Sequence, residues 1–143
     1  MLFRGAQFNS ERAQKQLITD EGIKILLDQL HVHMELDLRG ETEGSKFVPV
    51  ERYEKISMSV YATWGEHGIF TDEQQENVRK VFDILADETA YPIYFHCAGG
   101  GDRTGTIAFL LEALLGLDDE SLVTEYELSN LSVSGERHRF TEA

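Results

Sequence analysis

The apolar residues of the chain recur with helical spacing in two segments that each follow a threonine. After Thr19 they stand at i, i+3, i+4 and i+7, which predicts an amphipathic helix capped by that threonine. Thr71 and Gln74 form the pattern of a capping box, which predicts the start of a second amphipathic helix. The apolar positions are Ile23, Leu26, Leu27 and Leu30 in the first helix and Val78, Val81, Phe82, Leu85 and Ala86 in the second.

Three other segments have the composition or the alternation of β-strands. Residues 33–39 alternate between apolar and polar side chains, which predicts a half-buried strand. Residues 55–62 form a second candidate strand, and the β-branched and aromatic run at 91–96 predicts a short central strand. In the first of these, one face would carry Met34, Leu36 and Leu38 and the other Glu35, Asp37 and Arg39.

The C-terminal third begins with residues 104–116, which are apolar around most of a helical circumference. This predicts a buried helix that ends at Gly116. Asp118 is placed to cap a last helix, and we expect the polar residues 132–143 to form a loosely ordered tail. The apolar positions of that last helix are Leu122, Val123, Tyr126 and Leu128. The alternation of helices and strands predicts an α/β sandwich in a single domain over residues 1–143.

The charge of the chain narrows the possible partners. Thirteen basic and 26 acidic residues give a net charge of −13, which disfavours nonspecific binding to nucleic acid or to an anionic membrane. No run of apolar residues is long enough to span a membrane, and the first ten residues lack the apolar core of a signal peptide. One cysteine cannot form an internal disulfide, so we expect a reducing, cytoplasmic location.

That single cysteine, Cys97, lies between the strand at 91–96 and a glycine-rich loop that leads to Arg103 and the apolar helix. Backbone N–H groups of such a loop can converge on an anion, and the helix N-terminus adds a positive dipole. The arginine offers a planar fork that matches two phosphate oxygens. The same groups favour a thiolate, so we expect a solvent-accessible nucleophile that faces a bound phosphate. The phosphate-binding residues would be Ala98, Gly99, Gly100, Gly101, Asp102 and Arg103.

The sequence HCAGGGDRTG at 96–105 resembles the signature loop of the cysteine-based protein tyrosine phosphatase superfamily, His-Cys-x5-Arg-Ser/Thr. Asp102 and the following Arg-Thr-Gly make it most similar to microbial tyrosine and phosphoinositide phosphatases whose loop reads HCxxGKDRTG. LFRGAQF, ELDLRGETE and EYELSN resemble flanking segments of that branch, so the resemblance runs roughly from Leu2 to Asn130. Together with the alternation of elements it predicts a three-layer sandwich, with a mostly parallel sheet between helices on both faces.

The resemblance implies a phosphomonoester phosphatase that acts in two steps and without a cofactor or a metal. Cys97 attacks the phosphorus to form a cysteinyl-phosphate, which water then hydrolyses, while Arg103 and the loop amides stabilise the equatorial oxygens. His96 would order the loop through hydrogen bonds, and the hydroxyl of Thr104 could donate to the sulfur. The substrate would be a phosphorylated protein or a small phosphomonoester.

The proton donor to the leaving group has three candidates. Asp102 lies inside the loop, where the matching aspartate of this branch has been linked to catalysis. Glu66 falls in the region that holds the acid loop of related phosphatases. Asp72 is a third candidate, although a first-turn position favoured by the helix dipole explains it as well. We rank them in that order.

Other interpretations stay open. Gly101 stands where the branch usually has a lysine, which makes a phosphoinositide substrate doubtful and leaves a phosphate-binding module without turnover as an alternative. Sulfur transfer or arsenate reduction can use a similar loop, but arsenate reduction commonly needs further cysteines. A lone cysteine in an apolar run can be a plain core residue, but the glycines and Arg103 have no core role. Arg39 could line the pocket or pair with Glu43 at i+4 spacing.

Overall fold

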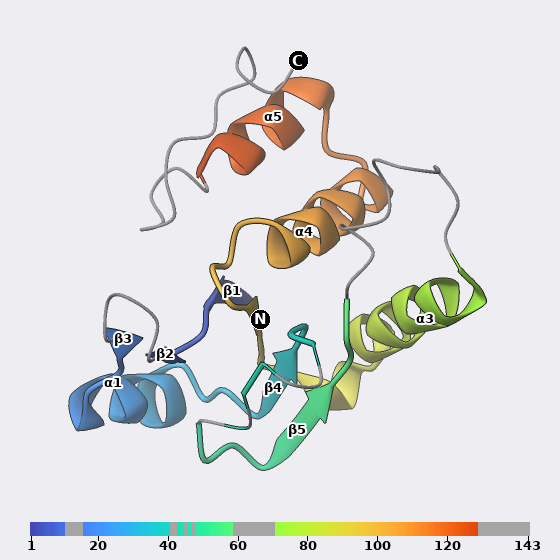
Figure 1. Cartoon of the computed structure of the whole chain (residues 1–143). Coiled ribbons are helices and arrows are strands. Elements are labelled where there is room, and N and C mark those ends of the chain that lie inside the picture. Colours follow the sequence, from blue (N-terminus) through green and yellow to red (C-terminus); the bar gives the residue numbers. More distant parts are fainter. Residues whose placement is uncertain (11–15, 41–42, 45, 47, 59–70, 129–143) are drawn as a thin grey trace.

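A computed structural model of the chain describes residues 1–10, 16–40, 43–44, 46, 48–58 and 71–128 (Figure 1). The predicted tail at 132–143 lies outside this part of the chain. The strands are β1 (Leu2–Ala6), β2 (Asn9–Ser10), β3 (Gln16–Leu17), β4 (Met34–Asp37), β5 (Arg52–Lys55) and β6 (Ile93–Cys97). The helices are α1 (Asp20–Lys24), the π-helical turn η1 (Ile25–Gln29), α3 (Asp72–Ala86), the 3-10 turn η2 (Glu88–Ala90), α4 (Arg103–Leu114) and α5 (Asp119–Glu127).

The main sheet has four parallel strands in the order β1-β6-β4-β5, and β2 pairs with β3 in a separate antiparallel ribbon. The mostly parallel sheet is therefore confirmed, and β6 is the central strand that the aromatic run predicted. Parallel strands need crossover connections, and the helices supply the cover that both faces of such a sheet require. The residue that follows the carboxyl end of β6 begins the glycine loop.

Helices cover both faces of this sheet, as predicted (Figure 1). One core joins apolar side chains of β4 and β6 to Val81 and Leu85 of α3 and Ile107 and Ala108 of α4. A second core on the opposite face joins Leu26 to Tyr94 and neighbouring apolar residues. In Figure 1, α1 lies on one side of the sheet and α3 and α4 lie on the other. The three-layer α/β sandwich is confirmed.

The predicted helix starts are confirmed by their caps. Thr19 Oγ1 accepts a hydrogen bond from the N–H of Gly22 at 3.1 Å. Thr71 and Gln74 form the reciprocal capping box, with bonds of 3.2 and 2.8 Å. Asp118 Oδ1 accepts from the N–H of Ser121 at 2.8 Å. These side chains satisfy amide groups that no helical carbonyl can reach, so each helix begins where a local oxygen is available.

Three expectations about burial and strand limits are wrong. Residues 33–39 are not half-buried: β4 is buried on both faces, because its polar side chains pair inside the protein. The strand expected at 55–62 is β5 at Arg52–Lys55, although the N–H groups of Ile56 and Met58 still donate to β4 and the residue after it. Residues 59–62 lie outside the described part. In the second amphipathic helix, Ala86 is exposed rather than buried.

The apolar helix at 104–116 is buried only in its first half. Thr104, Gly105, Ile107 and Ala108 of α4 are buried, whereas Leu114 is 74% exposed. Gly116 ends the helix with a φ of +86°, a left-handed conformation that glycine adopts easily, as predicted. In the described part of the chain, no helix is both long and apolar enough to cross a membrane.

Candidate active site

Cys97 is the last residue of β6, and the loop 98–102 connects it to Arg103, the first residue of α4. The loop therefore lies at the carboxyl edge of the parallel sheet, where ligands of α/β proteins commonly bind. Cys97 is paired with Ala6 at the end of β1. The N–H of Gly100 donates to Cys97 Sγ at 3.3 Å, so at least one loop amide points at the sulfur. This contact stabilises a negative charge there.

Gly100 is the position in the loop that requires glycine. Its φ is +76°, which side chains rarely tolerate. A Cβ at this position would lie 2.8 Å from the carbonyl carbon and oxygen of Gly5 and 2.9 Å from the nitrogen of Ala6. The loop thus packs directly against the backbone of β1, and the first strand forms one wall of the site.

The expectation of a solvent-accessible cysteine is wrong. Cys97 is only 2% exposed, because its side chain lies on the sheet face covered by α3 and α4 and joins the apolar core there. This burial shields the sulfur from bulk solvent and strengthens the electrostatic effect of the groups around it.

Arg103 is held by Glu43 through two hydrogen bonds. NH1 donates to Glu43 Oε2 at 2.5 Å and NH2 donates to Oε1 at 3.1 Å. Glu43 Oε2 also accepts from the N–H of Gly40 at 2.7 Å, which fixes the carboxylate. The hydrogen bond to Glu43 is the main cause that raises the pKa of Arg103, and the nearby Cys97 side chain adds to it. The guanidinium is therefore a permanent cation beside the sulfur.

The pair between Arg39 and Glu43 that the i+4 spacing suggested is wrong. Arg39 is almost fully buried and binds Asp37, with 2.8 Å from Nε to Oδ1 and 2.7 Å from NH2 to Oδ2. Its NH1 donates to Gln7 at 2.9 Å. Glu43 instead pairs with Arg103, 60 positions along the chain. Glu43 stands out in the sequence only as part of the ELDLRGETE segment, and spacing along the chain cannot reveal so distant a partner.

His96 points to the opposite face of the sheet from Cys97. Its Nε2 lies 3.0 Å from Glu35 Oε1, and its Nδ1 lies 3.2 Å from the carbonyl oxygen of Cys97. Glu35 Oε2 also accepts from the N–H of Val48 at 3.2 Å. His96 and Glu35 are both almost completely buried. This geometry is that of a residue that orders the backbone near the nucleophile, and it brings in Glu35, which the sequence analysis did not single out as a site residue.

The remaining candidates have different positions. Asp102 is the residue before α4, and its carbonyl accepts from the N–H of Thr106 at 2.8 Å, but its side chain makes no capping hydrogen bond to the helix. Thr104 Oγ1 is buried and has no hydrogen-bond partner among the described residues, so the expected donation to the sulfur is not made in this structure. Asp72 is the exposed first residue of α3, and no hydrogen bond or ion pair of the described residues joins it to the loop. Glu66 lies outside the described residues.

A strand, a cysteine, a glycine loop and an arginine at a helix start form an arrangement that can bind an anion beside the sulfur. Sequence comparison identifies the family: the model of the tyrosine phosphatase family matches residues 2–143, and the chain belongs to that family.

Curated relatives match over part of the chain. A segment of 68 residues is 37% identical to the triple specificity protein phosphatase PtpB of Mycobacterium tuberculosis, over 48% of this chain and 24% of that protein. A segment of 76 residues is 33% identical to a tyrosine-protein phosphatase of Nostoc commune, over 53% of this chain and 24% of that protein. The matched segments thus span about a quarter of each relative.

The fold is also that of a solved phosphatase. The core catalytic domain of the PP-IP phosphatase SIW14 from S. cerevisiae superimposes with a TM-score of 0.65, over 94% of this chain and 74% of that one. The sequences are 18% identical, so this likeness concerns the architecture.

Proposed function

We propose that this protein is a phosphomonoester phosphatase that works through a cysteinyl-phosphate on Cys97. The observation that carries the proposal is the proximity of three groups: a sulfur at the end of β6, a loop amide directed at it and the Arg103 guanidinium beside it. A phosphate dianion bound by the loop would place its phosphorus next to the sulfur. Two curated phosphatases with similar sequences support the same chemistry.

In the first step the Cys97 thiolate attacks phosphorus, so that an S–P bond forms and the bond to the leaving oxygen breaks. The leaving oxygen takes a proton from a carboxylic acid. In the second step water attacks the phosphorus, inorganic phosphate leaves and the thiolate returns. Arg103 and the loop amides stabilise the charge on the equatorial oxygens in both steps.

Glu43 would position Arg103 without competing with the substrate. A guanidinium has five N–H donors in one plane. The two bonds to Glu43 use one donor on each terminal nitrogen, so the edge that includes Nε keeps the geometry of a second fork. We assign that second edge to two phosphate oxygens, in the bidentate manner usual for arginine.

The acid is assigned to Asp102, with Glu66 as the alternative and Asp72 third. In support of Asp102, it lies inside the loop and directly precedes Arg103 at the start of α4. Substrates with different leaving groups can decide between Asp102 and Glu66. Replacing the true acid by its amide slows an alkyl phosphate, which needs a proton, far more than para-nitrophenyl phosphate, which does not.

Hydrolysis of para-nitrophenyl phosphate by the purified chain tests the proposal. We expect turnover in the presence of a metal chelator, and its loss in Cys97→Ser, with retained binding of inorganic phosphate. Turnover in Cys97→Ser at the rate of the unchanged chain would refute the mechanism. Phosphate binding without any turnover in the unchanged chain would instead favour the phosphate-binding module.

We propose a phosphorylated protein or a small phosphomonoester as the substrate, and a reducing cytoplasmic location that keeps the single thiol reduced. A panel of phosphotyrosine peptide, phosphoserine peptide, inositol phosphates and small phosphate esters, compared by kcat/KM, tests the substrate class. Preference for an inositol phosphate would overturn the choice of a protein or small phosphomonoester substrate.

A further inference from the structure

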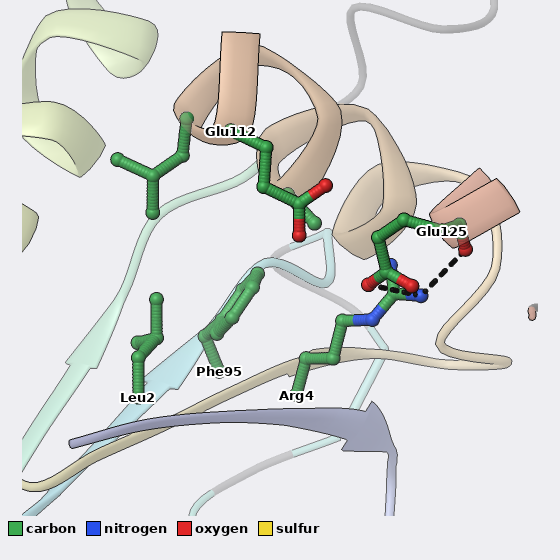
Figure 2. A pocket seen from close by; sticks show the side chains of 7 residues that line it. Leu2, Arg4, Phe95, Glu112 and Glu125 are labelled. Atoms are coloured by element: carbon green, nitrogen blue, oxygen red, sulfur yellow. Dashed lines mark hydrogen bonds and ion pairs between the residues drawn. The ribbon is translucent and has the colours of Figure 1, made fainter. Parts of the chain in front are cut away.

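A cavity separate from the cysteine loop lies between the sheet and the two C-terminal helices (Figure 2). Its volume is about 160 Å³, several times the roughly 30 Å³ that one water occupies in the liquid. The apolar part of its lining comes from β1, β6 and α4, namely Leu2, Phe95, Ala108 and Leu111. This part can hold a short hydrocarbon chain.

The polar part of the lining has an excess of negative groups. Arg4 of β1 is the one cation in the lining, and it faces two carboxyl groups, Glu112 of α4 and Glu125 of α5. Arg4 NH2 binds Glu125 Oε1 at 2.8 Å and the Glu125 carbonyl at 3.2 Å. The side chains of Arg4 and Glu125 are about one fifth exposed, so this end of the cavity reaches solvent.

Glu112 is the lining residue whose hydrogen bonding is not satisfied within the described part of the chain. Its Oε2 is buried and has no hydrogen-bond partner among the described residues. Figure 2 shows its side chain extending from α4 toward Phe95 and Glu125. Burial, followed by the neighbouring Glu125, raises the pKa of Glu112, while Arg4 opposes the shift. A buried acceptor without a donor is costly, which makes such an atom a natural ligand contact.

We propose that this cavity is a binding site for a small organic cation, a primary ammonium group on a short apolar chain. The ammonium group has three donors, which can satisfy Glu112 Oε2 and offset the second carboxylate. The apolar chain would lie on Leu2, Phe95 and Leu111. An anion would meet two carboxyl groups and an arginine already bound to one of them, so the charges favour a cation.

Titration of the ¹⁵N-labelled full chain with n-butylammonium, followed by NMR, tests the site. We expect saturable shifts of the amides at 2, 4, 95, 111, 112 and 125. n-Butanol, which has the same apolar chain without the charge, should bind about tenfold or more weakly, because a charge-assisted hydrogen bond is lost. Butyrate should bind more weakly still. The absence of saturable shifts at these amides, or equal affinity for butanol, would overturn the proposal.

Glu112→Gln keeps the size of the side chain and replaces the carboxyl group by an amide. We expect it to weaken n-butylammonium binding by about tenfold or more and to leave the affinity for n-butanol nearly unchanged. Glu120→Gln is the matched control, since Glu120 is exposed on α5 and does not line the cavity. Its affinity for n-butylammonium should equal that of the unchanged chain. Unchanged binding in a folded Glu112→Gln variant would refute the site.

Discussion

Two arginines of this chain each hold a carboxylate through two hydrogen bonds, but they lie in different surroundings. The Arg39 side chain is 2% exposed, and its bonds go to Asp37 and Gln7, deep between the sheet and the loop after β1. The Arg103 side chain is 19% exposed, its partner Glu43 is 30% exposed, and the side chain of Cys97 lies nearby. The same type of pair therefore lies in the interior in one place and holds a partly exposed cation beside a cysteine in the other.

The two arginines differ in how many of their guanidinium nitrogens donate hydrogen bonds to other side chains. All three nitrogens of Arg39 donate to side chains of the described residues, and Tyr53 completes the cluster by donating to Asp37 Oδ2 at 2.9 Å. Burial alone would raise the pKa of Asp37, but the hydrogen bonds from Arg39 hold it below its usual value. In contrast, Glu43 contacts the two terminal nitrogens of Arg103. Burial and the number of donating nitrogens thus distinguish the structural Arg39 from Arg103, to which we assign phosphate binding.

The largest effect is expected for Arg39→Met, which leaves the Asp37 carboxylate buried without its cation. Removing one partner of a buried pair costs about 3–5 kcal/mol of unfolding free energy. Urea unfolding measures this loss. Arg79→Met is the matched control, because Arg79 is two-thirds exposed on α3. Similar losses for both variants would contradict the structural role of Arg39.

Arg103→Lys should affect activity rather than stability. Lysine keeps the charge but lacks the planar fork. We expect kcat to fall by about 10²- to 10³-fold, as for the removal of other donors to a transition state. Steady-state hydrolysis of para-nitrophenyl phosphate measures the change, with Arg79→Lys as the control. A reduction of less than about tenfold would show that Arg103 acts only as a point charge.

Glu43→Gln tests whether this carboxylate positions Arg103. The amide removes the charge and one of the two acceptors, so we expect kcat to fall by about tenfold, with a smaller change in KM and little change in Tm. The sharper measurement is the double variant. If Glu43 acts only through the arginine, Glu43→Gln should cost nothing further in an Arg103→Lys background. Fully additive losses would assign Glu43 a separate role.

The smallest effect is expected at a third pair, Arg52–Asp87, in which both side chains are partly exposed. Hydrogen bonds from Thr89 and then Arg52 lower the pKa of Asp87 from 3.8 to about 2. The stabilisation is therefore present above pH 4 and is lost as the pH falls toward 2. Asp87→Asn should lower Tm slightly at neutral pH, and the difference should vanish in thermal melts near pH 2. A constant difference across this range would exclude ionisation as its cause.

Local sequence signals predicted much of the fold correctly, because their causes lie within a few residues. Thr19, Thr71 and Asp118 cap helices with their own side chains, and the β-branched and aromatic composition of 91–96 marks the central strand. The order of strand, cysteine, glycine loop and arginine can likewise be read directly from the sequence.

The errors arose where the deciding partner lies far along the chain. The alternation of apolar and polar residues predicted that residues 33–39 are half-exposed. Glu35 is nevertheless buried, because its partner is His96, which lies 61 positions away in the sequence. The i+4 spacing suggested Glu43 as a partner for Arg39, with lining of the pocket as the alternative, but the carboxylate binds Arg103. The apolar circumference of α4 predicted complete burial, yet its fully buried residues all lie in its first half. In each of these cases, contacts between residues far apart in the sequence determine the burial or the partner, and a local sequence pattern contains no information about such contacts.

The close packing of Gly100 on Gly5 and Ala6 has a practical consequence for mutational scanning. A survey that scores catalysis at every position should find intolerance not only around the nucleophile but also at the first strand, more than 90 positions upstream. Substitutions that displace the backbone of that strand would push the anion-binding loop out of shape. The N-terminal residues should therefore be treated as part of the support of this loop when tags or fusions are designed.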